Sequence, residues 1–231
     1  MKRERLITYT MEEQNLNTLT PDLKINVLPP KNTLIFKLVQ DLSLKNDDYV
    51  LEIGPTGTEH LSCLFQKAEN ISYLGAYYTE LKINETFPND KNGNSVVQFA
   101  KITDNKPGFE DIYFDCCFTA NTIYFWPDPL LYLSEIYRVL KPKGKMNLAF
   151  VEKNFGAHLP WTQLDFTFYE IDEVKSFFKQ SGFVDIEVKK MTETIMDQEG
   201  NEVSKPFIIV SGLKNKDYRI NVDNKGNQIY S

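Results

Sequence analysis

The sequence predicts an α/β fold: a doubly wound sheet that is mostly parallel and carries an antiparallel terminal hairpin strand. The chain has 231 residues, enough for one domain with a well-buried core. As far as residue 152, five short apolar runs alternate with segments of helical periodicity. Such alternation favours parallel strands with helices on both faces. A helix and two more strand patterns follow, and they predict the closing hairpin.

The expected elements follow one another along the chain with clear turn signals between them. Helices are expected at residues 31–43, 60–68, 79–87, 129–140 and 171–182, and strands at 49–54, 71–78, 95–102, 114–121, 145–152, 183–191 and 205–214. We assign residues 1–30 to an N-terminal arm, 31–213 to the main domain and 214–231 to a C-terminal tail or small hairpin. No second domain and no internal repeat is expected.

Composition narrows the function classes. A net charge of −6 disfavours binding to nucleic acid, and no apolar run reaches the length of a membrane span. The first residues lack the apolar stretch of a secretory signal. Three cysteines make neither a disulfide framework nor a metal site, and Cys116 and Cys117 are expected in or beside the core. These features indicate a cytoplasmic protein with a small-molecule partner, and they leave its oligomeric state open.

The segment EIGPTGT, residues 52–58, raises the question of a nucleotide-binding loop. In open α/β sheets, ligands bind beyond the carboxyl ends of the strands. The phosphate loop that ends in Gly-Lys-Ser/Thr is absent. A dinucleotide fingerprint would use Gly54, but Thr56 and Glu59 stand at its next two glycine positions. From these residues alone, a ligand loop and a ligand-free turn remain equal alternatives.

Residues 114–150, FDCCFTANTIYFWPDPLLYLSEIYRVLKPKGKMNLAF, narrow the choice. Their phrases F-D-x-x-x-x-x-N-x-I-Y-F-W-x-D-P and E-I-x-R-V-L-K-P-x-G-K resemble class I S-adenosylmethionine-dependent methyltransferases, in the small-molecule branch called type 11. VLEIG at residues 50–54 is similar to the first motif of that family. The resemblance covers residues 30–213. It implies a Rossmann-like sheet, S-adenosylmethionine as the cofactor and methyl transfer to a small molecule.

The resemblance also implies cofactor-binding residues in the first motif, E/D-x-G-x-G-x-G. Glu52 and Gly54 match the motif. Thr56 and Thr58 stand where two glycines are usual, and Gly57 falls out of register. Glu52, Gly54, Thr56 and Gly57 are therefore the candidates in this loop.

Four further candidates come from the ends of later strands. At the end of the second strand the family usually has an acid for the ribose hydroxyls, and here Tyr77 takes that position. At the end of the third strand an Asp usually binds adenine, and here Lys101 takes its place. Thr119 and Asn121 keep the pattern of the fourth strand.

Aromatic residues and one histidine are the candidates for substrate binding. Tyr124 and Trp126 could line a pocket and face the sulfonium by cation–π attraction, or they could belong to the core. His158 and Trp161 lie in the loop where this fold closes over substrate, and a surface position is the alternative for His158. Phe125 is expected in the core.

Methyl transfer from a sulfonium is an in-line displacement that depends mainly on positioning, so the sequence names no catalytic residue. Two rival hypotheses are a non-catalytic binding protein with the same fold and a nicotinamide oxidoreductase. Tyr77 and Lys101 favour the first rival. The second lacks both its fingerprint and its distal ribose acid.

Overall fold

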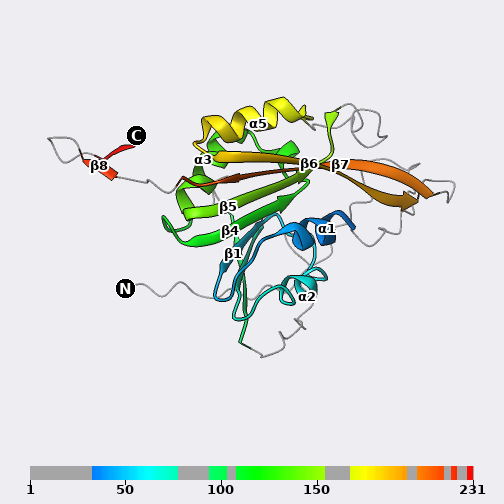
Figure 1. Ribbon diagram of the computed structural model, residues 1–231, viewed down its shortest axis with the longest axis horizontal. Coiled ribbons are helices and arrows are strands. Elements are labelled where there is room, and N and C mark those ends of the chain that lie inside the picture. The colour runs from blue at the N-terminus through cyan, green and yellow to red at the C-terminus, as the bar shows by residue number, and fades with distance from the viewer. Residues whose placement is uncertain are drawn as a thin grey trace.

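The computed structural model describes residues 33–77, 94–102, 108–153, 167–196, 202–215, 220–222 and 228–230. The predicted fold class is confirmed: the main body is a Rossmann-like sheet of seven strands, in the order β3-β2-β1-β4-β5-β7-β6 (Figure 1). The strand order reverses between β1 and β4, so the switch point lies between them. In sheets of this type the crevice at that point is where ligands bind.

Five strands are parallel, and the last two form the antiparallel hairpin at one edge. The parallel strands are β1 (Tyr49–Ile53), β2 (Ser72–Tyr77), β3 (Val96–Lys101), β4 (Phe114–Ala120) and β5 (Leu140–Phe150). Strand β7 (Glu202–Leu213) pairs antiparallel with β5 and with β6 (Val184–Met196). Strands β8 (Ile220–Val222) and β9 (Gln228–Tyr230) make a separate two-stranded sheet.

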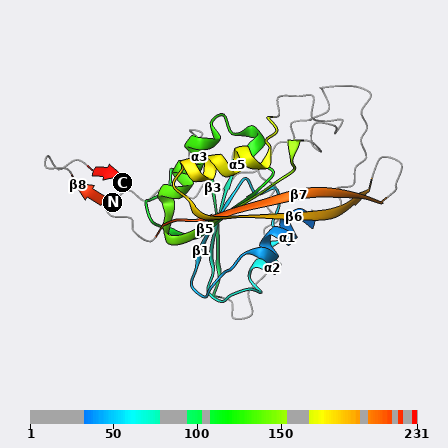
Figure 2. The same ribbon diagram turned by 45° about the horizontal axis from the view of Figure 1, so that its top comes forward.

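Helices cover both faces of the sheet (Figures 1 and 2). Helices α1 (Thr33–Asp41) and α2 (Leu61–Leu64) lie on one face, and α3 (Pro129–Val139) and α5 (Ile171–Gln180) lie on the other. A 3-10 turn, η2 (Ile123–Phe125), joins β4 to α3. Both layers are filled with buried apolar side chains. Cys116 and Cys117 are among them, as expected, at 5% and 0% exposure.

Helix α2 is shorter than the expected helix over 60–68. It has four residues and ends at Leu64. Residues 65–67 form turns instead: Lys67 N–H donates to Leu64 O, three residues back, at 3.1 Å, and Lys67 Nζ donates to Gln40 O of α1 at 2.6 Å. A contact with α1 therefore accompanies the early end of the helix.

Strand β5 begins five residues before the expected start at 145. Its first residue, Leu140, pairs with Phe114 directly after α3. The turn-forming segment behind it is bound into the sheet, because Lys143 N–H donates to Lys214 O at 3.0 Å and Lys214 N–H donates to Gly144 O at 2.9 Å. The helix expected at 79–87 lies outside the described residues.

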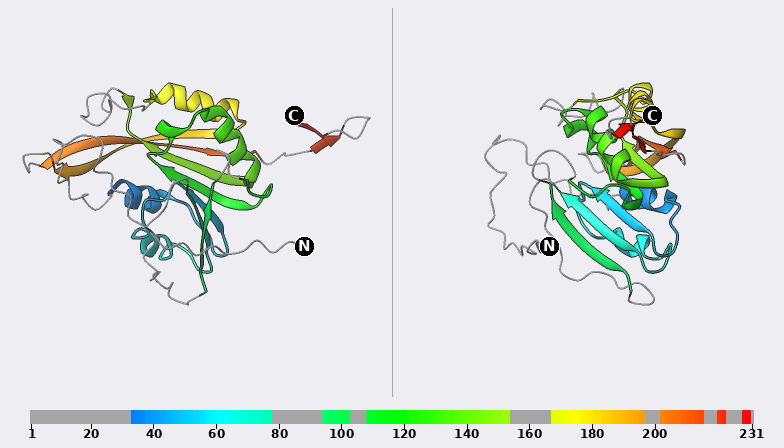
Figure 3. Two further views of the ribbon diagram at one scale, coloured as in Figure 1. Left: turned by 180° about the vertical axis from the view of Figure 1, so that it is seen from behind. Right: turned by 90° about the vertical axis from the view of Figure 1, so that its left-hand side faces the viewer.

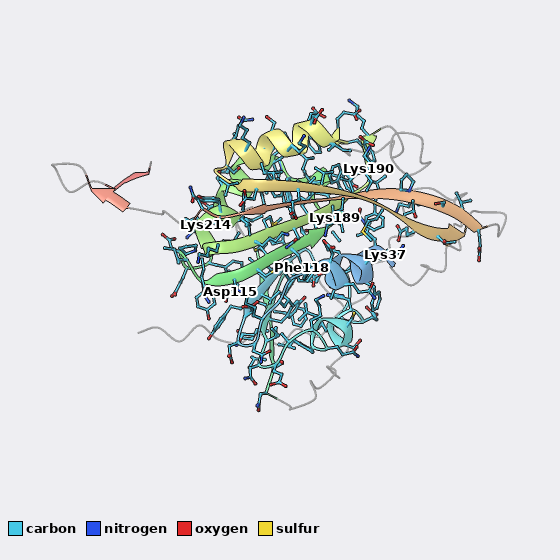
Figure 4. The ribbon with its side chains drawn as sticks, in the orientation of Figure 1. Lys37, Asp115, Phe118, Lys189, Lys190 and Lys214 are labelled. Atoms are coloured by element: carbon cyan, nitrogen blue, oxygen red, sulfur yellow. The ribbon has the colours of Figure 1, made fainter. Side chains whose placement is uncertain are left out.

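Helix α1 is fixed to the long hairpin by polar contacts as well as by apolar packing. The buried Glu193 carboxylate of β6 accepts a hydrogen bond from Leu34 N–H at 3.0 Å, at the start of α1. At the other end of the helix, Lys189 Nζ lies 2.6 Å from Asp41 Oδ1. Figures 3 and 4 show the hairpin crossing beside α1, and Figure 4 labels Lys37 of α1 and Lys189 of β6. A carboxylate at a helix N-terminus satisfies free N–H groups there.

The start of α3 gives a first testable prediction. Asp128 Oδ1 accepts a hydrogen bond from Leu131 N–H at 3.0 Å, and Pro129 occupies the first helical position. We expect Asp128→Ala to lower the free energy of unfolding by about 1 kcal/mol, because the cap is lost. Asp128→Asn is the matched control and should stay within about 0.5 kcal/mol of the wild type. Urea unfolding followed by circular dichroism measures both, and equal losses in the two variants would contradict the capping role.

Lys214 predicts a pH dependence of stability. Its side chain is 1% exposed, and Nζ donates to the carbonyls of Leu140 at 2.8 Å and Arg138 at 3.3 Å, at the end of α3 (Figure 4). Burial lowers its pKa to about 8, and the charge of Arg138 acts in the same direction. In the unfolded chain a lysine titrates near 10.4, so between about pH 8 and 10.4 the unfolded chain binds more protons. The free energy of unfolding should therefore rise with pH in that window.

Comparison with Lys214→Met isolates this contribution from those of other titrating groups. Between pH 7.5 and 10, we expect the wild type to gain on the order of 1–2 kcal/mol relative to the variant. Parallel pH profiles for the two proteins would show that Lys214 has an ordinary pKa.

Candidate functional site

The ends of β1 and β4 meet at the switch point through Gly54. This residue has a φ of 69°, and a Cβ on it would lie 2.5 Å from Thr122 Cγ2. Its N–H donates to Ala76 O at 2.7 Å. Thr119 Oγ1 donates to Ile53 O at 2.7 Å and lies 2.6 Å from Thr122 Oγ1. Only glycine fits this close turn without strain. The candidate residues Gly54 and Thr119 lie at the adjacent ends of β1 and β4.

The other residues of the loop differ in their exposure to solvent. Thr56 is exposed, whereas Thr58 is buried at 7% exposure. The Glu59 carboxylate lies against Gly57, where a Cβ would otherwise point. Because α2 is a single turn, its dipole adds little positive potential to the loop that precedes it.

Glu52 is held inside the protein. Its side chain is 3% exposed, accepts a hydrogen bond from Tyr73 OH at 2.5 Å and lies 2.7 Å from His60 Nε2. Burial, and then the neighbouring carboxylate, raise the pKa of Tyr73 well above its ordinary value. The Tyr73 hydroxyl and His60 Nε2 both contact the same carboxylate oxygen of Glu52, Oε2. Glu52 therefore joins β1, β2 and α2 from within.

Sequence reasoning named Glu52 and missed His60 and Tyr73. The register provides a signal for one of them: Val50 pairs with Tyr73 and Glu52 with Gly75. Tyr73 is thus a diagonal neighbour of Glu52 on the same face, within reach of a long side chain. His60 contacts Glu52 because of the path of the loop between them, and no sequence pattern predicts that path.

Tyr77 and Lys101 lie side by side. Their Cα atoms are partners in the parallel register of β2 and β3, and Ile102 N–H donates to Tyr77 O at 2.7 Å. Lys101 is exposed and Tyr77 is partly exposed. Among the described residues, neither side chain has a hydrogen-bond or ion-pair partner. A phenol and an ammonium therefore occupy the two positions where the resemblance leads one to expect carboxylates.

Asn121 and Tyr124 connect the ends of β4 and β5. Asn121 has a φ of 57°, and its N–H donates to Ala149 O at 2.9 Å. Tyr124 OH accepts a hydrogen bond from Val151 N–H and lies 3.3 Å from Asn121 Oδ1. Burial raises the pKa of this phenol, so Tyr124 stays protonated and contributes hydrogen bonds rather than charge.

Trp126 is buried at 4% exposure and stacks on Tyr132 with ring centroids 4.8 Å apart. Among the residues that the structure describes, its buried Nε1–H has no hydrogen-bond partner. An unsatisfied buried donor costs about 1–3 kcal/mol, so Trp126 contributes less to stability than its apolar burial alone would give. The prediction that Phe125 lies in the core is wrong: it is 62% exposed, because the 3-10 turn points it outward. His158 and Trp161 lie outside the described residues.

A separate groove of about 620 Å³ lies at the opposite end of the sheet. Its lining includes Tyr49, Ser72, Val96 and Phe109, from the amino ends of the first three strands and the segment before β4. None of the candidate site residues lines it. In the described part of the chain, no group of His, Cys, Asp or Glu side chains could hold a metal ion, and no helix is long and apolar enough to cross a membrane.

Comparison with known proteins agrees with the fold. Residues 51–148 match the model of a family described as "Methyltransferase domain". The chain is 28% identical over 102 residues to phosphoethanolamine N-methyltransferase 2 of Caenorhabditis elegans. That match covers 40% of this chain and 23% of the relative, so this chain spans less than a quarter of that protein.

Two solved structures illustrate the structural likeness. An S-adenosylmethionine-dependent methyltransferase of Thermotoga maritima has a TM-score of 0.55 and 20% identity, over 79% of this chain and 88% of that chain. Phosphoethanolamine N-methyltransferase 2 of Haemonchus contortus, in complex with phosphomonomethylethanolamine and S-adenosylhomocysteine, has a TM-score of 0.55 and 15% identity, over 79% and 52%. Residues 51–148 are therefore similar to a methyltransferase domain, and the chain has the fold of these S-adenosylmethionine-dependent methyltransferases.

Proposed function

We propose that the protein transfers a methyl group from S-adenosylmethionine to a small molecule. The observation that carries this proposal is the turn at Gly54. A positive φ and the lack of space for a Cβ bring the backbone to the switch point, which is where this fold binds its ligand. The similarity of residues 51–148 to a methyltransferase domain supports this chemistry.

Some residues at the carboxyl edge of the sheet suit S-adenosylmethionine better than others. Gly54 brings the backbone into a close turn against Thr122 at the switch point, and Asn121 offers an amide at the end of β4. The Glu59 carboxylate in the same loop is suited to a ligand ammonium. At the ribose position Tyr77 offers one hydroxyl, whereas a carboxylate would accept from both ribose hydroxyls. We therefore propose binding of S-adenosylmethionine that is weakened at its ribose.

S-adenosylmethionine supplies an activated methyl group when bound, and the departing sulfur is neutral. The contribution of the chain is then to align the acceptor and exclude water. Tyr124 is the described residue that we assign to the acceptor side, whereas Trp126 packs in the core against Tyr132. The two phosphoethanolamine N-methyltransferases among the similar proteins make small phosphorylated amines the first acceptors to assay.

Restoring the missing acid tests this proposal. Tyr77→Asp should tighten binding of S-adenosylmethionine and S-adenosylhomocysteine by about tenfold, because a charged acceptor gains hydrogen bonds worth about 1.5–3 kcal/mol. Isothermal titration calorimetry measures the affinities. Tyr77→Asn is the control. Asparagine is similar in size to aspartate but uncharged, so this variant should gain much less affinity. Unchanged or weaker binding by Tyr77→Asp would show that Tyr77 already has a specific role.

A second candidate function is a binding or interaction protein that keeps the fold and has lost methyl transfer. The observation that favours it is the pairing of Tyr77 with Lys101 where the resemblance leads one to expect acids. Absence of calorimetric binding at millimolar S-adenosylmethionine by both wild type and Tyr77→Asp would select this candidate.

A further inference from the structure

We propose that the ribose end of this site recognises phosphate, so that the protein binds an adenine nucleotide with a phosphate on the 2′ or 3′ oxygen of its ribose. The inference rests on the proposed function only for the place of the adenosine group. It concerns Tyr77 and Lys101, which lie together at the ends of β2 and β3.

The geometry brings the two groups to one ligand position. Residues paired in register on parallel strands are about 4.8 Å apart and point to the same face. Tyr77 and Lys101 are the last residues of their strands, so both side chains border the carboxyl edge. Gly54 N–H donates to Ala76 O, one residue before Tyr77, so the loop after β1 lies beside the Tyr77 end of this pair.

The charges favour an anion at this position. The Lys101 ammonium is exposed and has no ion-pair partner among the described residues. The two carboxylates of the neighbouring loop are directed elsewhere: Glu52 is buried with Tyr73 and His60, and Glu59 lies against Gly57. An ammonium with three donors and a phenolic O–H suit phosphate oxygens.

In dinucleotide-binding folds, the exchange of an acidic residue for a basic one distinguishes a ribose with a free 2′-hydroxyl from one with a 2′-phosphate. An acid after the second strand holds the free 2′-hydroxyl, whereas a basic residue nearby accommodates a 2′-phosphate. In this chain the acid position holds a phenol and the neighbouring strand supplies a lysine. The site has therefore lost the group that selects a free diol and has gained a group that selects a phosphate.

Calorimetric titration of the whole chain with adenosine, adenosine 2′-monophosphate, adenosine 3′-monophosphate and adenosine 5′-monophosphate tests the inference. We expect the 2′- or 3′-phosphate to bind at least about tenfold more tightly than adenosine and the 5′-phosphate. Lys101→Met should remove this preference, Lys101→Arg should retain it, and the preference should fall with added salt. Lys101 is exposed at the end of an edge strand, so both variants should fold, which circular dichroism checks.

The outcomes separate this inference from the proposed function. Binding of S-adenosylmethionine without any preference for the 2′- or 3′-phosphate would overturn the inference and leave the function standing. A phosphate preference without binding of S-adenosylmethionine would support the inference and overturn the function. Inorganic phosphate that competes as well as the nucleotide, or a preference that survives in Lys101→Met, would also overturn the inference. If neither class of ligand binds, both proposals fail.

Discussion

Replacing Glu52 by alanine is expected to lower the free energy of unfolding by about 3–5 kcal/mol, the cost of removing one partner from a buried charged group. The carboxylate is 3% exposed, accepts from Tyr73 OH at 2.5 Å and lies 2.7 Å from His60 Nε2. Without it, the phenol and the imidazole are left buried with no acceptor between them. Urea denaturation followed by circular dichroism measures the loss.

Two milder variants keep this prediction testable if Glu52→Ala fails to fold. Glu52→Gln keeps the size and one acceptor oxygen, and should cost about 1–2 kcal/mol. Tyr73→Phe removes one hydrogen bond to a charged group, and should cost about 1.5–3 kcal/mol. The double variant Glu52→Gln/Tyr73→Phe should cost less than the sum of the two, since the residues interact directly. Additive losses would show that the contact contributes nothing to stability.

Gly54→Ala should lower the free energy of unfolding by about 2–4 kcal/mol and reduce binding of S-adenosylmethionine. An alanine at a φ of 69° is strained, and its Cβ would lie 2.5 Å from Thr122 Cγ2. The loop must then move away from β4, which displaces the backbone that we assign to the ligand. Denaturation and calorimetry on the same preparation measure the two effects.

Thr122→Ser separates the clash from the backbone strain. It removes Cγ2 but keeps the hydroxyl that lies 2.6 Å from Thr119 Oγ1. In the Thr122→Ser background, Gly54→Ala should cost at least about 1 kcal/mol less than in the wild type. Gly57→Ala is the matched control in the same loop. There the new Cβ meets only the flexible end of Glu59, so stability should change by less than about 1 kcal/mol. A cost for Gly57→Ala as large as that for Gly54→Ala would contradict this view of the loop.

Most of the fold could be predicted from the sequence because its signals are local and repeated. Apolar strands such as VLEIG and FDCCF, separated by amphipathic helices, gave the alternation that defines the sheet. Where tertiary contacts decide, the sequence was a poorer guide. The chain turns after Leu64, where Lys67 binds Gln40 of α1, and the backbone pairing of Lys143 with Lys214 accompanies the early start of β5.

The sequence named residues at the strand ends but not the contacts that they make. Of the residues named from the resemblance, Gly54 and Thr119 lie at the adjacent ends of β1 and β4, and Asn121 follows β4 beside β5. The contacts of Glu52 were not foreseen, because His60 reaches it across a turn and Tyr73 from a neighbouring strand. Phe125 was misplaced since an apolar residue in a short 3-10 turn has no periodicity to show which way it points.

The most direct measurement is a crystal structure of the whole chain grown with saturating S-adenosylhomocysteine. We expect the ligand across the carboxyl ends of β1, β2 and β4, in contact with the Gly54 turn and with its ribose beside Tyr77. A structure in which the side chains of Tyr77 and Lys101 fill that position, with the ligand absent or bound elsewhere, would contradict a cofactor site on this edge of the sheet.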